Sequence, residues 1–239
     1  MGSNSDRLLA ARFEQVNLRR PGQERLWFDP GYTFRMQAQE RMFLAALQRR
    51  GIEGLRGRKI LDIGSGSGYW MRRCAEWGAE VEDIHGVELL GDRVALARRR
   101  CHPQMQIACG NAVDLAFRNQ TFDVVVMFLV LSMMRDRTER MRVADEAARV
   151  LKPGGVVMWY DFRYRPWREP DMIGMPRGEI ERCFPGFDLE LKSGSALPPL
   201  TRRLAPYAWS MCMWLDNLKV LNTHYVGTLK KPDGQRMES

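Results

Sequence analysis

Residues 59–69 read Lys-Ile-Leu-Asp-Ile-Gly-Ser-Gly-Ser-Gly-Tyr, an apolar run followed by three glycines at alternate positions. The apolar run predicts a buried strand, because the strands of parallel sheets are covered on both faces. Glycines directly after such a strand allow the backbone to approach a ligand closely before a helix begins. A dinucleotide-binding turn has its third glycine one position later, where this chain has Tyr69. The turn therefore excludes the usual dinucleotide form and predicts a different bound group.

After this turn, helices alternate with short apolar strands. The helix after the turn is predicted over residues 69–77. Asp92 is a good N-cap for the next helix, which runs to Arg100, and a third helix is expected over 138–151. The strands are expected at 59–63, 84–88, 105–109, 122–128 and 156–160. This alternation predicts a parallel sheet that is covered by helices on both faces.

The two flanking parts of the chain have a different pattern. Apolar residues at helical spacing predict two helices before the core, at 7–20 and 33–50. After Asp161 we expect a loop rich in arginine, proline and aromatic residues (162–178), a short helix (178–183), a strand (187–192), a proline-punctuated apolar stretch (197–221) and a last strand (224–230). The chain is therefore expected to form one domain over 1–239, with an N-terminal helical lid (1–57), a core (58–161) and a C-terminal part (162–239) that carries an insertion at 197–223.

Five segments of the core agree with one protein family in their order and spacing. Residues 61–68, Leu-Asp-Ile-Gly-Ser-Gly-Ser-Gly, closely resemble motif I of the class I S-adenosylmethionine (SAM) dependent methyltransferases. The other four segments are Glu88 at the end of the second strand, Gly110-Asn111-Ala112, Phe122–Val126 and Arg149–Gly155. The resemblance covers about residues 58–161, and the five segments together are highly specific.

The resemblance implies SAM as the cofactor and gives roles to individual residues. Asp62 would orient the glycine turn, and Gly64 and Gly66 would lie against the cofactor. Glu88 would bind the ribose hydroxyls, for which a carboxylate is a good acceptor. The family usually has Asp where this chain has Asn111, whose side-chain oxygen can still accept a hydrogen bond from the amino group of adenine. The expected SAM-binding residues are Arg35, Asp62, Gly64, Ser65, Gly66, Gly68, Glu88, Leu89, Asn111, Ala112 and Phe128.

The family also implies a fold. We expect a Rossmann-like α/β fold whose seven-stranded sheet has the order 3-2-1-4-5-7-6, with strand 7 antiparallel and helices on both faces. Residues 197–223 would then form a helical insertion between strands 6 and 7. The N-terminal lid commonly reaches the site in this family, so Tyr32 or Arg35 is expected near the SAM carboxylate. The positive charge makes Arg35 the better candidate of the two, and a residue on a solvated helix face is its alternative.

The sequence after the fourth strand disfavours several classes of methyl acceptor. Residues 127–130 read Met-Phe-Leu-Val, without the proline pair of amino-methylating nucleic acid enzymes and without the cysteine of five-position cytosine enzymes. The next loop, 132–137, has Asp136 as its one carboxylate, whereas protein arginine enzymes need two glutamates there. Catechol-type enzymes place metal-binding carboxylates after strands four and five, and of these positions only that of Asp161 is matched. We therefore expect no bound metal.

Two later segments are expected to bind the acceptor. Tyr160, Arg163 and Tyr164 belong to an aromatic and arginine-rich stretch that suits a planar, sugar-like or anionic ligand, although a surface loop with an arginine bias explains the same pattern. Asp161 and His224 are the candidate catalytic bases, since either could take a proton from the acceptor. For His224, a purely structural histidine is an equal alternative. The leading hypothesis is O-methylation of a small molecule such as a saccharide or a related metabolite.

The charge of the chain leaves other functions open. The formal net charge is +8, and 31 of the 37 basic residues are arginines spread along the sequence. Such a balance attracts nucleic acid, anionic lipid or acidic substrates. An RNA-directed methyltransferase is therefore one alternative, although the sequence shows no RNA-binding appendage, and a SAM-binding protein without catalysis is another. The apolar stretch 204–221 is expected to cap the acceptor pocket, and a helix lying on a membrane surface is its alternative.

Cysteine usage and hydropathy concern the location of the protein. The five cysteines include no C-x-x-C pair, and the longest apolar run is too short to span a bilayer. We therefore expect reduced thiols and a cytoplasmic location.

Overall fold

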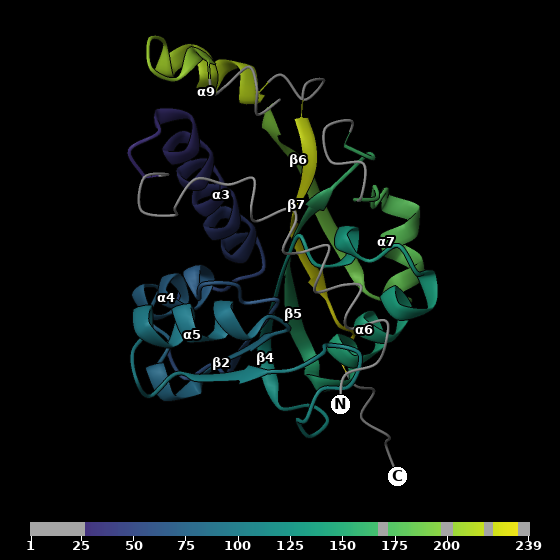
Figure 1. The fold of residues 1–239 in the computed structure, drawn as a ribbon. Coiled ribbons are helices and arrows are strands. Elements are labelled where there is room, and N and C mark those ends of the chain that lie inside the picture. Colours follow the sequence, from purple (N-terminus) through teal and green to yellow (C-terminus); the bar gives the residue numbers. More distant parts are fainter. Residues whose placement is uncertain (1–26, 167–171, 197–202, 218–221, 234–239) are drawn as a thin grey trace.

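The computed structural model describes residues 27–166, 172–196, 203–217 and 222–233, and its centre is one twisted sheet (Figure 1). The seven strands lie in the order β3-β2-β1-β4-β5-β7-β6. Their bounds are β1 Ile60–Ile63, β2 Ile84–Glu88, β3 Gln106–Cys109, β4 Phe122–Phe128, β5 Leu151–Phe162, β6 Asp188–Ala196 and β7 Asn222–Lys230. Neighbours among β1 to β5 pair in parallel, whereas β7 is antiparallel to both β5 and β6. The predicted strand order and the antiparallel seventh strand are confirmed.

Helices cover both faces of the sheet, as predicted. In Figure 1, α3, α4 and α5 lie on one face, and α6 and α7 lie on the other. The helices are α3 Pro30–Arg49, α4 Tyr69–Glu76, α5 Gly91–Arg100, α6 Arg137–Val150, α7 Arg177–Cys183 and α9 Trp209–Asn217, with short 3-10 turns η1 Val81–Asp83 and η2 Leu131–Met133. No described helix is long and apolar enough to cross a membrane.

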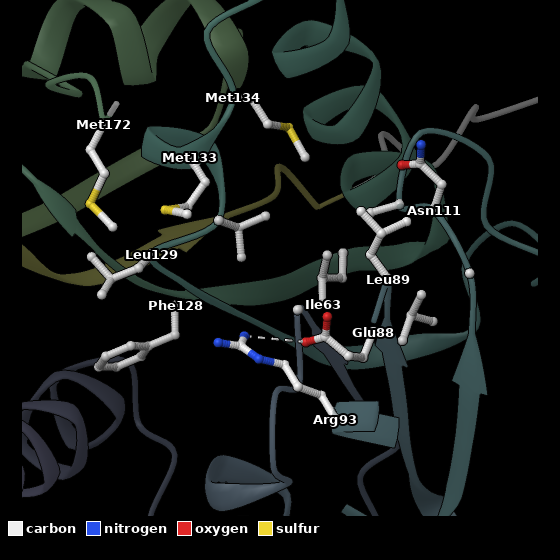
Figure 2. Close-up of a pocket in the computed structure, with 15 residues that line it drawn as sticks. Ile63, Glu88, Leu89, Arg93, Asn111, Phe128, Leu129, Met133, Met134 and Met172 are labelled. Carbon is white, nitrogen blue, oxygen red and sulfur yellow. Dashed lines mark ion pairs between the residues drawn. The ribbon is translucent and has the colours of Figure 1, made fainter. Parts of the chain in front are cut away.

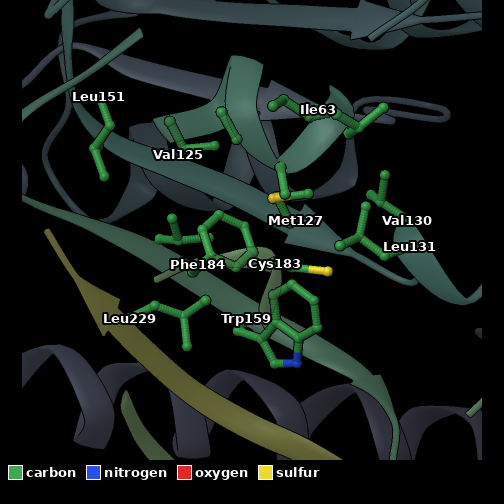
Figure 3. Close-up of a cluster of buried hydrophobic side chains, with 14 of the residues drawn as sticks. Ile63, Val125, Met127, Val130, Leu131, Leu151, Trp159, Cys183, Phe184 and Leu229 are labelled. Atoms are coloured by element: carbon green, nitrogen blue, oxygen red, sulfur yellow. The ribbon is translucent and has the colours of Figure 1, made fainter. Parts of the chain in front are cut away.

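The central strand β4 supplies apolar side chains to both layers. Val125 and Met127 point into a core formed with α6 and α7, and Figure 3 shows these side chains beside Trp159 and Phe184. Val124 and Val126 point the other way, into the core under α3, α4 and α5. Successive side chains of a strand face opposite sides, so a strand that is buried on both faces must be apolar at every position. This requirement explains the apolar run from Val124 to Phe128 in β4.

Helix α3 joins the N-terminal part of the chain to the C-terminal strands. It begins at Pro30, whose ring suits the first turn of a helix, and Asp29 caps it by accepting a hydrogen bond from the backbone N–H of Tyr32. At its other end Arg50 donates to Thr228 Oγ1 on β7 at 3.0 Å and to the Asp188 carbonyl on β6 at 2.9 Å. The segment predicted as a lid therefore also packs as a layer of the fold.

Among the predicted boundaries that differ from the structure, two lie in the core and have a clear physical reason. Helix α5 begins at Gly91 with Leu90 as its N-cap, so the prediction of Asp92 as the cap is wrong. The Asp92 carboxylate instead accepts a hydrogen bond from the backbone N–H of Arg93, inside the first turn. Strand β5 begins at Leu151, before the glycine turn, because Leu151 pairs with Phe122 ahead of a register shift.

The C-terminal strands are longer than their apolar patterns indicate, because pairing extends them. Strand β6 continues to Ala196, which pairs with Asn222 at the start of β7. Helix α9 follows β6 and precedes β7 in the chain, which confirms a helical insertion at this place. The predicted helix at 7–20 and residues 197–202 and 218–221 of the insertion lie outside the described residues.

Candidate active site

A cavity of about 160 Å³ lies at the carboxyl ends of β1, β2 and β4 (Figure 2). The carboxyl ends of parallel strands are where ligands bind in open α/β sheets, because loops rather than helix bodies meet there. The cavity is lined by Ile63, Gly64, Val87, Glu88, Leu89, Arg93, Gly110, Asn111, Ala112, Phe128, Leu129, Val130, Met133, Met134 and Met172. Six of the residues predicted to bind SAM are among these: Gly64, Glu88, Leu89, Asn111, Ala112 and Phe128.

The glycine turn has a backbone conformation that other residues rarely adopt. Gly64, Gly66 and Gly68 have φ angles of +72°, +57° and +75°, in the left-handed region. A Cβ atom on Gly68 would also lie 2.2 Å from Cys101 Sγ. The backbone N–H groups of Gly64 and Ser65 both donate to the Val87 carbonyl, at 2.8 and 3.1 Å. The turn is therefore fixed against the end of β2 and cannot accept side chains at its glycines without strain.

Glu88 connects the turn to the next helix. Its side chain is buried, and its two oxygens accept hydrogen bonds from the backbone N–H groups of Gly66 and Leu90, at 2.9 and 3.0 Å. Arg93 lies 3.9 Å away, and Figure 2 shows the two side chains side by side in the cavity. Each carboxylate oxygen can accept a second hydrogen bond. Glu88 is therefore held in place and still able to bind hydroxyl groups.

The side chains of Asp62 and Ser65 are buried and do not line the cavity. Burial, and secondarily the charge of Glu88, raises the pKa of Asp62 well above its usual range. Neither the Asp62 carboxyl oxygens nor Ser65 Oγ has a hydrogen-bond partner among the described residues. Asp62 thus lies on β1 two residues before the first glycine of the turn, and among the described residues no hydrogen bond performs the orienting role predicted for it.

The far end of the cavity has the residues expected at the adenine. Figure 2 shows Leu89 and Asn111 together at this end. Asn111 Oδ1 accepts a hydrogen bond from the backbone N–H of Val113 at 3.1 Å, which fixes the orientation of the amide. The oxygen has a second lone pair, so it can also accept from an amino group.

The opposite end is apolar and was not predicted in detail. Leu129, Met133 and Met172 gather there, near the ring of Phe128 (Figure 2). Leu129 has a φ of +54°, which is unusual for a residue with a branched side chain, and its N–H donates to the Tyr160 carbonyl at 2.8 Å. The sequence carries no motif for these residues. Arg93 was also missed, although its place in the first turn after Glu88 could have indicated it.

Tyr160 and His224 belong to a stack of rings that starts at the cavity. Phe128 lies 4.2 Å from Tyr160 with the ring planes 9° apart, and Tyr160 lies 4.5 Å from His224 with the planes 17° apart. Tyr160 is 1% exposed and His224 is 3% exposed. His224 Nδ1 is also 2.8 Å from Thr223 Oγ1. Neither Tyr160 nor His224 lines the cavity, and Phe128 separates them from it.

Burial also determines the protonation of His224. Loss of solvation, and secondarily the nearby charge of Arg35, lowers the pKa of His224 to about 3. The imidazole is therefore neutral at ordinary pH, but a group with so low a pKa is a weak base. Arg35 itself lies beside the ring of Tyr32, 5.3 Å from its centroid, and does not line the cavity.

Asp161 lies on the opposite face of β5 from Tyr160 and His224. It is buried, and its two oxygens accept hydrogen bonds from the backbone N–H groups of Ser132 and Phe162, at 3.1 and 2.9 Å. Burial raises its pKa to about 6, against the opposing effect of these hydrogen bonds. Through Ser132 it holds η2, the turn that carries Met133 into the cavity. The two predicted bases are thus not brought together.

Arg163 and Tyr164 lie away from this cavity. The Arg163 guanidinium donates to Tyr164 Oη at 3.0 Å and lies 5.0 Å from the centroid of the Tyr164 ring and 4.9 Å from that of Tyr225. Arg163 lines a second cavity, between α3, α9 and the C-terminal strands. Metal binding has no candidate either, because the described residues contain no group of three or more histidine, cysteine or acidic side chains that could hold a metal ion.

The sequence of the core is similar to that of known proteins. Residues 60–155 match a methyltransferase-domain family. The demethylmenaquinone methyltransferase of Bacillus licheniformis is 30% identical over 121 residues, which cover 50% of this chain and 49% of that protein. The enzyme of the same name from Lysinibacillus sphaericus is 31% identical over 104 residues, 43% of each chain. The chain thus matches about half the length of these curated relatives.

Solved structures extend the likeness to most of the chain. A SAM-dependent methyltransferase from Mesorhizobium loti has a TM-score of 0.58 and 17% identity, covering 80% of this chain and 98% of that one. A [4+2]-cyclase, SpnF, has a TM-score of 0.60 and 20% identity, covering 83% of each chain. At such identities the likeness shows the fold alone. The matched core is thus similar to a methyltransferase-domain family, the fold is one that SAM-dependent methyltransferases have, and this likeness implies SAM as the cofactor.

Proposed function

We propose that this chain transfers a methyl group from SAM to a small-molecule acceptor that has an apolar ring. The observation that carries the acceptor class is the lining of the cavity at its apolar end. Leu129, Met133 and Met172 meet there beside Phe128. Flexible thioethers and an aromatic ring suit a flat apolar molecule and offer no hydrogen bonds to a polyhydroxyl compound.

The residues of the other end fit the cofactor. Gly64 lines the cavity with a left-handed backbone, and a Cβ atom there would lie 3.2 Å from Val130 Cγ2, so the backbone is bare where a ligand would approach. Glu88 would hold the ribose hydroxyls, and Asn111 would accept from the adenine amino group. SAM, when bound, supplies an electrophilic methyl group on a sulfonium sulfur.

The protein's own contribution would be orientation and exclusion of water. A methyl group on a sulfonium is already activated, so alignment of the acceptor provides much of the acceleration. Phe128 and Leu129, at the end of β4, would hold the acceptor ring between the cofactor site and the methionine side chains. Tyr160, stacked behind Phe128, would keep that ring in position.

The saccharide O-methylation favoured by the sequence receives less support than a quinone-like acceptor. A sugar hydroxyl needs a base near its proton. The two predicted bases, Asp161 and His224, are buried behind η2 and behind Phe128, and neither lines the cavity. An acceptor that ionises readily, such as a reduced quinone ring, needs less assistance. The curated relatives are named for a quinone, demethylmenaquinone.

An acceptor assay tests the proposal. The protein would be incubated with methyl-labelled SAM and, separately, a reduced naphthoquinone that lacks its ring methyl group, a monosaccharide, and RNA. We expect label in the naphthoquinone product. Label in the sugar would restore the saccharide hypothesis, label in RNA would support the RNA-directed alternative, and SAM binding without any labelled product would favour a protein without catalysis.

A pair of methionine variants tests the location of the acceptor. Met133→Gln places an amide in the apolar end of the cavity, whereas Met141→Gln makes the same change on α6, packed against the core. We expect Met133→Gln to raise KM for the acceptor about tenfold and to leave SAM affinity unchanged, because a ring must then be bound against an unpaired polar group. Met141→Gln should leave KM unchanged, and equal effects of the two changes would contradict this location.

A further inference from the structure

A second cavity, of about 650 Å³, lies between α3, the strands β6 and β7, and α9. Figure 1 shows α9 and α3 at the same end of the molecule as β6. The described lining residues are Ala38, Arg41, Met42, Ala45, Arg49, Arg163, Leu191, Lys192, Ser193, Met213, Tyr225 and Val226. None of them lines the first cavity, so this is a separate space.

The described lining of the second cavity is strongly basic. It contains Arg41, Arg49, Arg163 and Lys192 and no acidic side chain. Arg49 is paired with Glu190, which lies outside the lining. Arg41 and Lys192 are exposed, and neither forms an ion pair with a described residue. The mouth of the cavity therefore offers positive charge to a ligand from solution.

Helix α9 places apolar side chains on its outer face, next to this charge. Its inner face is fixed by Cys212, which is fully buried against Phe34. Trp214, Met211 and Met213 are 62%, 46% and 44% exposed. A helix on the surface of a globular protein normally turns charged or polar residues outward. Met213 both lines the cavity and reaches the surface, so the basic mouth and the apolar face are continuous.

We propose that the outer face of α9 and the basic mouth of the second cavity bind the surface of an anionic membrane. Tryptophan and methionine side chains can enter the boundary between headgroups and acyl chains without leaving buried polar groups unpaired. Arg41 and Lys192 would face the lipid phosphates, to which basic residues are attracted from solution. The combination favours a lipid surface over a protein partner, since it supplies charge and apolar area side by side. The proposal does not depend on methyl transfer.

Vesicle sedimentation tests the proposal on the whole chain. Phosphatidylcholine vesicles with and without phosphatidylglycerol would be spun down with the protein at rising salt. We expect sedimentation with the anionic vesicles, weakening as salt rises, because screening removes the contribution of the exposed cations. Binding that is equal for the two kinds of vesicle, or absent from both, would overturn the proposal.

A charge-matched pair of variants localises the contact. Arg41→Ala with Lys192→Ala removes two cations at the second cavity, and Arg99→Ala with Arg142→Ala removes two exposed cations on α5 and α6. We expect the first pair to weaken vesicle binding about tenfold or more and the second pair to change it less than twofold. Equal weakening by both pairs would show that only net charge matters and would overturn a local site.

A third variant addresses the apolar face. Trp214→Ala with Met211→Ala removes exposed side chains only, so the fold is expected to be retained, as circular dichroism would check. Vesicle binding should fall about tenfold even at low salt, because the lost area is apolar. If the parent protein instead dimerises with rising concentration, and this variant abolishes the dimer while leaving vesicle binding intact, a second copy covers the face and the proposal fails.

Discussion

The two ends of the first cavity differ in whether backbone or side chains form them. At the cofactor end the backbone forms the site, with left-handed glycines, paired N–H groups and a carboxylate that two N–H groups hold in place. At the acceptor end the side chains of Leu129, Met133 and Met172 form it. A backbone conformation restricts the residues that can adopt it, whereas an apolar wall can be built from many residue sets. The cofactor end can therefore be predicted from a sequence, and the acceptor end cannot.

The largest effect that would test this contrast is expected at Gly68. Gly68→Ala would force a left-handed alanine and a Cβ atom 2.2 Å from Cys101 Sγ. Gly57 has a similar φ of +68°, but a Cβ atom there meets nothing within 4 Å. We expect Gly68→Ala to lower the free energy of unfolding by about 3–4 kcal/mol and Gly57→Ala by about 1 kcal/mol, as measured by urea denaturation.

A double variant separates the two causes at Gly68. Cys101→Ala removes the sulfur that the new methyl group would meet. Gly68→Ala in that background should therefore cost about as much as Gly57→Ala. If Gly68→Ala lowers the free energy of unfolding by the same amount in this background, steric conflict with Cys101 is not the reason. The left-handed backbone alone would then explain the loss.

The next effect concerns the side chains behind the acceptor end. For His224, with a pKa of about 3, the unfolded state takes up a proton first as pH falls below 6.5, so unfolding becomes easier. For Asp161, with a pKa of about 6, the unfolded state loses its proton first as pH rises above 3.8. Unfolding therefore becomes easier as pH rises, the opposite of the effect of His224. Each contribution is about 3 kcal/mol over about two pH units. The two nearly cancel between pH 4 and pH 6.

Single variants would reveal these opposite slopes. Relative to the parent protein, His224→Phe should gain stability at pH 4.5 compared with pH 7.5, and Asp161→Asn should gain at pH 7.5 compared with pH 4.5. Urea denaturation at the two pH values measures both. Two variants with the pH dependence of the parent would mean that neither group is as buried as the structure places it.

A smaller effect is expected on cofactor affinity. Glu88→Gln keeps the size of the side chain but loses the charge and one acceptor toward the N–H groups of Gly66 and Leu90. Calorimetric titration should show SAM bound about 10- to 100-fold more weakly, since hydrogen bonds to a charged group are worth about 1.5–3 kcal/mol. Glu82→Gln, an exposed change on η1, is the matched control and should leave the affinity unchanged. Unchanged affinity in both would remove Glu88 from the cofactor site.

The smallest effect on stability is expected at Leu129. Its left-handed backbone costs about 1 kcal/mol, which glycine would relieve, whereas the lost side chain removes part of the acceptor wall. Leu129→Gly should therefore change stability by less than about 1 kcal/mol while it raises KM for the acceptor. Gln120 has a φ of +52° and is exposed, so Gln120→Gly should gain stability without any change in KM. Equal changes in KM for the two variants would show that the Leu129 side chain does not contact the acceptor.

Much of the fold and half of the site could be predicted from the sequence. The apolar strands and the glycine turn indicated the sheet order through the family resemblance, and Glu88 was found through the same resemblance. Positions that depend on tertiary pairing could not be found in this way. The start of β5 depends on Leu151 meeting Phe122, and the length of β6 depends on its pairing with β7. Met172 reaches the cavity from a segment without any pattern of its own.

The acceptor-side predictions show a second limit. Tyr160 and Asp161 are neighbours in the sequence, yet a strand sends them to opposite faces of the sheet. Asp161 supports η2, and Tyr160 supports Phe128, so both stand one layer behind the residues that line the cavity. The position of these residues near a strand end correctly indicated that they lie close to the site. It could not distinguish residues that line the cavity from residues that pack behind the lining.

The pairing of β6 with β7 has a consequence for redesign. The insertion leaves β6 at Ala196 and returns at Asn222, and these two residues are paired across an antiparallel ladder that continues to Asp188 and Lys230. The exit and entry points are therefore fixed by the pairing of the two strands. For a loop between two fixed points, a doubling of length costs only about 0.6 kcal/mol. Insertions from related domains could thus be exchanged at this place. Such an exchange would alter the surface that the insertion presents to partners, while His224 keeps its pairing with β6 and its place in the ring stack.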